Sequence, residues 1–341
     1  MPPEVDFSNY IVFMGIPDDR MVMAVGEGLL NRPSYNFPGT ASFLNYLDGR
    51  LNGAQQLWFG PPSGPISLNI PSGPMVNHLA DPDLYGVALD KARRVADALG
   101  GPCFNAPDAV LANGRDRVAE ALSGLDGVVA PRTVRLAPSD LRSLTVMLRD
   151  LSLTYPLLIR PVGAHGGQRL LRIDTSEGLA DRVAAWMFDA PVYVTEFHDF
   201  ADPDGVYRKH RLAVVGDKVV LRSVVIGDDW LLHAARQSEA TRADEAARLA
   251  AFESEVLPRI APAVAEIARR LSLDLFGIDC HLDADGRLLI FEANACMSLL
   301  LRTMPPPNMW EAPVAAVRTA LLDLLAHPER WRRQGERFPT G

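Results

Sequence analysis

One segment near the C-terminal end of the chain limits the possible folds more than any other. It runs from Phe276 to Met297 and reads FGIDCHLDADGRLLIFEANACM. Apolar and polar residues alternate on both sides of the turn signal Asp283-Ala-Asp-Gly286, and this pattern predicts a β-hairpin. The apolar positions of its two strands are Ile278, Leu282, Leu288, Ile290 and Phe291.

Polar residues gather on one face of this predicted hairpin. If the turn has two residues, Asp279 pairs with Ile290, and Glu292 is its diagonal neighbour on the same face. Asn294 extends that face. Buried carboxylates are too costly to leave unpaired, so a cation is the expected partner, and oxygen ligands of this kind suit Mg²⁺ with substrate phosphates. The alternative is an acidic hairpin whose carboxylates cap neighbouring elements or pair with arginines.

Length and composition narrow the function classes. A chain of 341 residues with 48% hydrophobic residues is long enough for two or three domains. We find no apolar run of membrane-spanning length and no signal peptide in the first residues, MPPEVDFSNY. A net charge of −8 without a dense basic run argues against a nucleic-acid partner. The three cysteines, Cys103, Cys280 and Cys296, fit a reduced cytoplasmic compartment.

The chain divides into three regions, expected at residues 1–105, 106–190 and 191–341. In the first, a helix is expected to begin at Asp81, with Pro82 at its first position and Gly100 just past its end. In the third, a long helical stretch over Thr241–Leu271 is expected to be interrupted near its prolines.

A glycine-rich loop lies between two apolar strands in PLLIRPVGAHGGQRLLRI. Its glycines permit a positive φ and a close approach to a ligand, and successive free N–H groups form an anion-binding nest. Arg160 ends the first strand and would add a charge toward phosphate oxygens. His165 at the tip could contact the ligand. A tight hairpin is the alternative, and His165 is then a solvent-exposed turn residue. The loop glycines are Gly163, Gly166 and Gly167.

Two further strands carry polar residues at places where a ligand could bind. In YVTEFHDF, Glu196 at a strand exit could accept hydrogen bonds from ribose hydroxyls, or it is a surface glutamate. In the hairpin that turns at Gly216-Asp217, strand alternation puts Lys209 and Arg211 on one face and Arg208 and His210 on the other. Lys209 and Arg211 could balance polyphosphate charge; an exposed basic edge is the alternative.

The order of these pieces resembles the ATP-grasp superfamily, which includes D-alanine–D-alanine ligase, glutathione synthetase and other carboxylate–amine ligases. The similarity covers residues from about Ala106 to Ser298. It implies an N-terminal α/β domain at 1–105, followed by two α+β subdomains that clamp the nucleotide. These are a central subdomain with the glycine-rich loop at 106–190 and a C-terminal subdomain with the metal site at 191–341.

The resemblance also assigns roles to residues. It implies that Asp279, Glu292 and Asn294 bind two Mg²⁺ ions, with Glu292 bridging them. Arg160 and Arg117 stand where phosphate-binding lysines are usual, in a chain that has only three lysines. The remaining nucleotide contacts that it implies are the glycine-rich loop, Arg211, and the interdomain strand with Thr195, Glu196, Phe197 and His198.

The function expected from these features is ATP-dependent ligation of a small carboxylic acid to an amine through an acyl phosphate, with ADP and phosphate released. Lys209 and Arg211 would stabilise the transferred phosphoryl group, and Arg302 could meet an anionic substrate group. Two alternatives remain: a small-molecule kinase of the same fold, and a nucleotide-binding regulator without turnover. Related ligases are often homodimers, but no motif here sets the oligomeric state.

Overall fold

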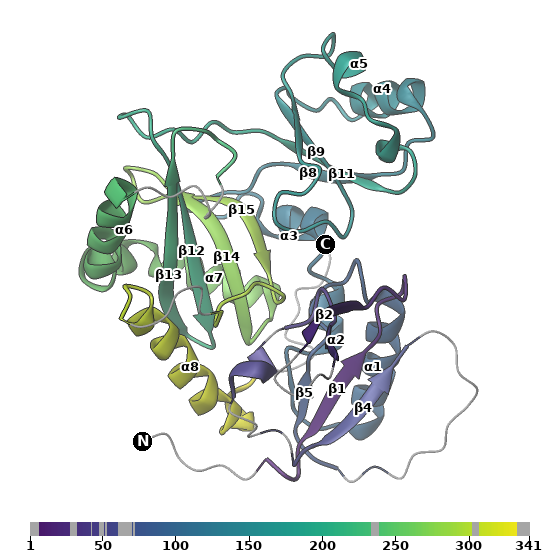
Figure 1. The fold of residues 1–341 in the computed structure, drawn as a ribbon, viewed down its shortest axis with the longest axis vertical. Helices are drawn as coiled ribbons and strands as arrows, with labels where there is room; N and C mark the ends of the chain where they lie inside the picture. The colour runs from purple at the N-terminus through teal and green to yellow at the C-terminus, as the bar shows by residue number, and fades with distance from the viewer. Residues whose placement is uncertain are drawn as a thin grey trace.

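The computed structural model describes residues 7–27, 33–41, 43–47, 51, 53–60, 70, 72–232, 239–301 and 307–332. Within these ranges the strands form three larger sheets and a two-stranded ribbon, with helices packed against them. The fold is therefore mixed α/β. Figure 1 shows three bodies: the N-terminal part in purple and blue, the central part in teal above it, and the C-terminal part in green and yellow beside them.

The N-terminal domain is built on a parallel sheet with the strand order β4-β1-β5-β6. The connections of a parallel sheet must cross over it, and helix α1 supplies one such crossover between β5 and β6. The elements of this domain are β1 (Ile11–Gly15), the ribbon β2 (Met23–Glu27) and β3 (Pro33–Asn36), η1 (Phe43–Tyr46), β4 (Gln55–Phe59), β5 (Met75–Asn77), α1 (Gly86–Leu99) and β6 (Cys103–Phe104).

Helix α1 begins later than the sequence suggested. A start at Asp81 was expected, but the helix spans Gly86–Leu99. The reason is local: Asp81 Oδ1 accepts a hydrogen bond from the backbone N of Asp83 at 2.7 Å. This side-chain turn competes with helix formation and frees the other Asp81 oxygen for a distant partner. The C-terminal end matches the expectation, since Gly100 has a φ of 66°.

The central subdomain has an antiparallel sheet with the order β10-β9-β11-β8 and a hydrophobic core of its own. Strand β11 (Val192–Glu196) pairs with β8 and β9, so the expected boundary after residue 190 cuts through this sheet. The other elements are β8 (Thr133–Leu136), α4 (Leu141–Asp150), β9 (Leu157–Pro161), β10 (Leu171–Ile173), α5 (Leu179–Arg182) and η2 (Ala185–Met187). Two helices precede it, α2 (Pro107–Leu111) and α3 (Arg115–Leu122).

The C-terminal subdomain has a five-stranded sheet with the order β13-β12-β14-β15-β7. The helical stretch expected over Thr241–Leu271 is two helices, α6 and α7, joined by the π-helical turn η4 rather than broken at a proline. The elements are β7 (Val128–Val129), β12 (Tyr207–Val215), β13 (Lys218–Gly227), α6 (Glu239–Ala251), η4 (Phe252–Val256), α7 (Leu257–Leu271), β14 (Leu275–Leu282), β15 (Leu288–Asn294), α8 (Glu311–Leu325) and η5 (Pro328–Arg330).

The β14–β15 hairpin forms as expected, but its register differs. Leu282 pairs with Leu288, which leaves a turn of five residues, and a β-bulge follows between Asp279 and Cys280. The bulge inserts Phe291 as an extra residue on β15, so Asp279 pairs with Glu292 and not with Ile290. The expected pairing was therefore wrong. The two carboxylates are direct rather than diagonal neighbours, because opposite residues of an antiparallel pair share one face.

One hydrophobic core unites the N-terminal domain with the C-terminal subdomain, whereas the central subdomain packs separately. Trp331 stacks edge-on against Tyr10 and Phe104, which belong to the N-terminal domain. Asn105 Nδ2 donates to the carbonyl oxygen of Leu275 at 2.8 Å. The central subdomain is therefore the part whose position depends least on a shared core.

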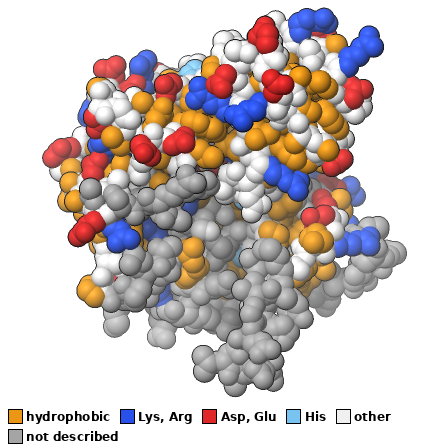
Figure 2. Space-filling view, turned by 45° about the horizontal axis from the view of Figure 1, so that its top comes forward, with side chains coloured by type: hydrophobic (Ala, Val, Ile, Leu, Met, Phe, Trp, Pro, Cys, Tyr) orange, Lys and Arg blue, Asp and Glu red, His pale blue; other side chains and the backbone are white. Residues whose placement is uncertain are grey.

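In the described part of the chain, none of the helices combines the length and apolar character that crossing a membrane requires. The face seen in Figure 2 has a band of hydrophobic side chains across its middle. Basic and acidic groups are interspersed around this band, so charges of the two signs are mixed on this face.

Candidate functional site

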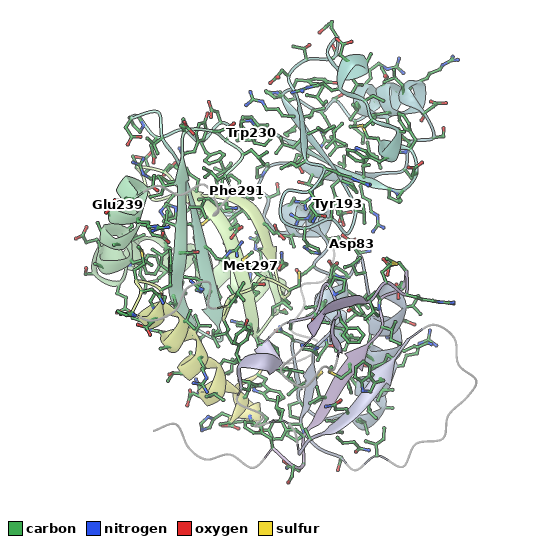
Figure 3. All side chains as sticks on the ribbon, viewed as in Figure 1. Asp83, Tyr193, Trp230, Glu239, Phe291 and Met297 are labelled. Carbon is green, nitrogen blue, oxygen red and sulfur yellow. The ribbon has the colours of Figure 1, made fainter. Side chains whose placement is uncertain are left out.

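A cavity of about 720 Å³ lies where the three parts of the chain meet. This volume falls within the range of roughly 300–1,000 Å³ that small-molecule sites commonly have. Figure 3 shows Asp83 and Tyr193 together between the N-terminal and central parts, whereas Trp230 and Phe291 come from the C-terminal part. Asp83, Trp230 and Phe291 all line the cavity.

Oxygen donors from two neighbouring strands line one wall of this cavity. They are Asp279 on β14, with Glu292 and Asn294 on β15, and we call them the oxygen-donor set. Asp279 pairs with Glu292 across the strands, and Gly277 pairs with Asn294, so the three polar side chains share a face. The Asn294 amide donates to Oε1 of Glu292. Two carboxylates and an amide are the ligands that hard divalent cations such as Mg²⁺ accept, and these residues could hold such an ion.

Two cations on β12 neutralise Asp279, whose side chain is only 6% exposed. Arg211 donates Nε to Oδ1 at 2.7 Å and Nη2 to Oδ2 at 2.9 Å. Lys209 Nζ lies 3.5 Å from Oδ2. Both cations line the cavity. Arg208, which precedes Lys209, and His210, which lies between the two cations, are buried on the other face of the strand. The alternation expected along this strand is confirmed.

Glu292 forms an ion pair with a residue of another element, Arg115, which is the first residue of α3. Arg115 Nη2 lies 2.7 Å from Oε1 of Glu292. Burial acts to raise the pKa of Glu292, but the charges of Arg115 and Arg160 outweigh it and lower the pKa to about 2. Glu292 is therefore an anion at neutral pH and remains a good ligand for a cation.

The glycine-rich loop between β9 and β10 forms another part of the cavity lining. Gly163, Gly166 and Gly167 line the cavity and have positive φ angles of 74°, 63° and 74°. Arg160 at the end of β9 donates to the carbonyl oxygen of Ala164. Its Nε is buried without a hydrogen-bond partner among the described residues. Burial lowers the pKa of Arg160 to about 10, and the nearby Arg115 charge adds to this effect. A buried, unpartnered cationic donor beside a glycine-rich loop fits an anionic ligand such as a phosphate.

The N-terminal domain contacts this loop and the strand β11 beside it through two carboxylates. Asp81 Oδ2 lies 2.6 Å from Nε2 of His165 at the loop tip. Tyr193 donates its hydroxyl to Asp83, with both carboxylate oxygens at 2.9 Å. A Cβ on Gly163 would lie 3.0 Å from Cδ2 of Leu84, so the loop also packs closely on this turn. The structure therefore describes a loop closed against the N-terminal domain.

The end of β11 and the residues that follow it form a part of the cavity lining that includes an aromatic ring. Thr195 Oγ1 lies 3.0 Å from Oγ1 of Thr133, and Glu196 Oε1 accepts from the backbone N of Thr154 at 2.8 Å. The Phe197 ring lies under the Arg172 guanidinium, 4.1 Å from ring centre to Cζ, and packs edge-on against Trp230. Aromatic and aliphatic walls with a few polar groups are typical of sites for a flat ring. Thr195, Glu196, Phe197 and His198 all line the cavity.

One sequence expectation is not supported by its position. Arg117 is exposed, donates to the carbonyl oxygen of Leu111 at 3.4 Å and does not line the cavity. Two residues correspond to about 200° around a helix, so Arg115 and Arg117 project from opposite sides of α3. Arg115 is the cavity residue. A helix over Arg115–Leu122 was expected from the sequence, but the sequence did not show which side of it faces the cavity. Arg302 lies outside the described residues.

Two more cavity residues were missed from the sequence. Asp81 was read only as the start of a helix. Arg222 is the extra residue of the β-bulge in the β12–β13 pair, and it donates to the carbonyl oxygens of Leu299 and Leu301 at 2.8 and 2.6 Å. Burial lowers the pKa of Arg222, and the Arg211 charge adds to this effect. Nothing in the local pattern of VVLRSVV indicates that this arginine reaches the cavity.

No protein-family model and no curated protein matches the sequence. Solved structures do match the fold. The VanG D-Ala:D-Ser ligase from Enterococcus faecalis aligns over 94% of this chain and 98% of its own, with a TM-score of 0.55 and 13% identity. The D-alanine–D-alanine ligase from Bacillus anthracis aligns over 95% and 98%, with a TM-score of 0.51 and 11% identity. The resemblance seen in the sequence is thereby confirmed at the level of the fold, which this chain shares with these two ligases.

Proposed function

We propose that this protein is an ATP- and Mg²⁺-dependent ligase that joins a small carboxylic acid to an amine through an acyl phosphate. One observation supports this most strongly. The oxygen-donor set and the glycine-rich loop face one cavity together with Arg160, whose Nε has no hydrogen-bond partner among the described residues. Ligase neighbours with the same fold support the reaction class.

The residues that line the cavity suggest where each part of the nucleotide would bind. The adenine ring would lie against Phe197 and Trp230, and Glu196 would accept from the ribose through Oε2, which has no partner among the described residues. The phosphates would lie between the glycine-rich loop and the oxygen-donor set. Mg²⁺ held by Asp279, Glu292 and Asn294 would neutralise charge on the phosphates during transfer.

The cations would act on the reacting groups. A carboxylate oxygen of the acid attacks the γ-phosphorus, the bond to the β-phosphate oxygen breaks, and ADP leaves. Arg211 and Lys209 lie beside Asp279 and would stabilise the charge on the transferred phosphoryl group. The amine then attacks the carbonyl carbon, phosphate leaves, and the amine loses a proton.

The loop and Arg222 would serve the second step. An acyl phosphate is lost to hydrolysis if water reaches it, and the loop held by Asp81 and Asp83 would exclude water. Arg222 uses Nε and Nη2 for backbone carbonyls, so its Nη1 is available to an anionic group of a substrate.

The test combines product identity with one variant and its control. Protein with Mg-ATP is given amino acids and small acids, singly and in pairs, while ADP and product mass are followed. ADP that forms only with a matched acid and amine, with a product of their summed mass minus water, supports the ligase. A single substrate that gains a stable phosphate supports a kinase instead. Glu292→Gln is expected to lower turnover about 100-fold or more, and the exposed Glu253→Gln should not change it. Unchanged turnover in Glu292→Gln would contradict the proposed site.

A further inference from the structure

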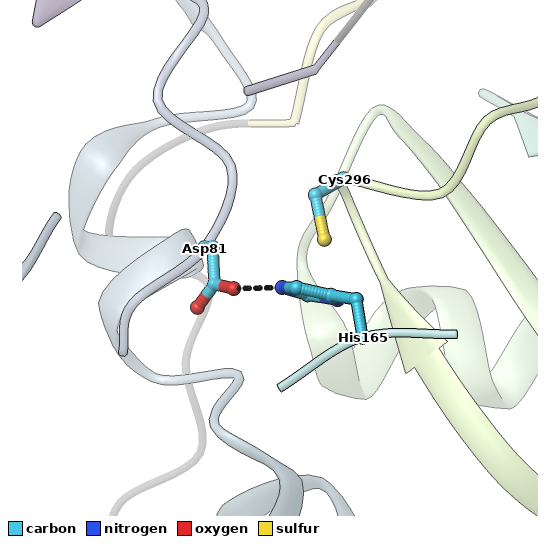
Figure 4. Close-up of side chains that lie close together, drawn as sticks. All are labelled: Asp81, His165 and Cys296. Carbon is cyan, nitrogen blue, oxygen red and sulfur yellow. Dashed lines mark hydrogen bonds and ion pairs between the residues drawn. The ribbon is translucent and has the colours of Figure 1, made fainter. Parts of the chain in front are cut away.

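A second group of possible metal ligands lies in the same cavity, apart from the oxygen-donor set. It consists of Asp81, His165 and Cys296, and its three ligand atoms lie within 4.8 Å of one another. Figure 4 shows the three side chains converging from separate segments of the chain. Asp81 comes from the N-terminal domain, His165 from the tip of the glycine-rich loop, and Cys296 from the segment after β15. No role in the proposed ligase reaction requires a thiol at this place.

We propose that Asp81, His165 and Cys296 form a binding site for a divalent transition-metal ion of the Zn²⁺ class. Carboxylate oxygen, imidazole nitrogen and thiolate sulfur are the three ligand types that proteins use for Zn²⁺. Thiolate and imidazole select such ions over Mg²⁺, which prefers oxygen. The chain thus offers two neighbouring sites of different chemistry, one for a hard cation and one for a softer cation.

The geometry requires only a small adjustment. A hydrogen bond, with one proton between the two atoms, now joins His165 Nε2 and Asp81 Oδ2 at 2.6 Å. Metal–ligand bonds of about 2.0–2.2 Å in a tetrahedral site separate two such atoms by about 3.3 Å, so the ion takes the place of that proton. The glycines on either side of His165 give the loop the freedom to move by this amount.

Neighbouring groups already orient the ligands. Asp81 Oδ1 accepts from the backbone N of Asp83 at 2.7 Å, which leaves Oδ2 for the ion. The Cys296 thiol now donates to Oδ1 of Asn294, with Sγ at 3.3 Å, and it gives up this proton when the sulfur binds the ion. Metal sites depend on such supporting contacts. The Asp81 side chain is 5% exposed and that of His165 is 39% exposed, so the site has one buried side and one side open to an entering ion.

The position of this site gives it a consequence for the reaction. An ion bound there ties the glycine-rich loop to the N-terminal domain and to the segment after β15. The central subdomain has a separate core, so these contacts decide whether the loop is open or closed. Zn²⁺ is therefore expected to hold the loop closed and to slow nucleotide exchange. This consequence rests on the proposed function, whereas the metal site itself does not.

Co²⁺ is the probe that tests the site, because a cysteine ligand gives it a sulfur-to-cobalt charge-transfer band. Metal-free, reduced full-length protein is titrated with Co²⁺, and we expect one equivalent to produce this band. Cys296→Ser should abolish the band, and His165→Gln should weaken Co²⁺ binding about tenfold or more. Cys103→Ala is the matched control, since Cys103 is buried in the N-terminal domain and its loss should leave the band unchanged.

Other results would overturn the site. These are a wild-type protein without the band, a band that persists in Cys296→Ser, or displacement of the ion by excess Mg²⁺. Circular dichroism checks that Cys296→Ser is folded. His165→Gln is an independent test of the metal site, because His165 lies in a partly exposed loop. Glu292→Gln separates the two proposals: it should lose ligase turnover and keep the band. A wild-type protein that has ligase turnover but lacks the cobalt charge-transfer band would overturn only the metal site.

Discussion

The pair between Arg115 and Glu292 gives a prediction whose size follows from the structure. Glu292 has an ordinary pKa of 4.5, and the folded protein lowers it to about 2. At 1.36 kcal/mol for each pKa unit, this difference corresponds to about 3 kcal/mol. The Glu292 side chain is 22% exposed, so screening by water is limited. Arg115 is the strongest of the charges that oppose burial, and we expect it to provide about 2 kcal/mol of the total.

A double-mutant cycle measures this coupling. Arg115→Gln, Glu292→Gln and the double variant are unfolded with urea at pH 7, and the interaction free energy is taken from the four values. The control is Arg94 with Asp90, whose N–O distance is also 2.7 Å but whose side chains are 73% and 40% exposed. Its coupling should be at most about 0.5 kcal/mol. An Arg115–Glu292 coupling no larger than that of the control would refute the reasoning.

The pH dependence has a definite sign. Because the folded-state pKa of Glu292 is depressed, its contribution to stability is fully present above pH 4.5 and is lost as the pH falls toward about 2. At pH 3 the stability advantage of ionised Glu292 should therefore be roughly half its value at pH 7 or less. A coupling that stays constant between pH 7 and pH 3 would show that the pair is not held by the carboxylate charge.

Two further variants test how the loop is held. Gly163→Ala and Gly205→Ala both force alanine to a positive φ, 74° and 78°, and each should cost about 1 kcal/mol of stability. Only Gly163→Ala adds a contact with Leu84, so it alone should weaken ATP binding, by about fivefold in calorimetry. Equal ATP affinities of the two variants would show that the packing of the loop on Leu84 does not affect ATP binding. Tyr193→Phe leaves the buried Asp83 without its hydroxyl donor and should lower stability by about 1–2 kcal/mol. Hydrogen exchange in the glycine-rich loop should then rise, and unchanged exchange would argue against a role in holding the loop.

The sequence alone was sufficient for features that depend on short-range patterns. Alternation along β12 put Lys209 and Arg211 on the cavity face, because strand side chains point to opposite faces in turn. The hairpin of β14 and β15, with its polar face, followed in the same way. The order of the motifs along the chain also indicated the fold, through its resemblance to the ATP-grasp ligases.

The tertiary structure decided what depends on register, helix phase and distant contacts. The β-bulge that places Asp279 opposite Glu292 has no mark in the local alternation, because an extra residue in one strand is stabilised by the packing around it. The packing of α3 turns Arg115, and not Arg117, toward the cavity. The contact between Asp81 and His165 joins residues 84 positions apart, and only the closing of two separately folded parts around one cavity brings them together.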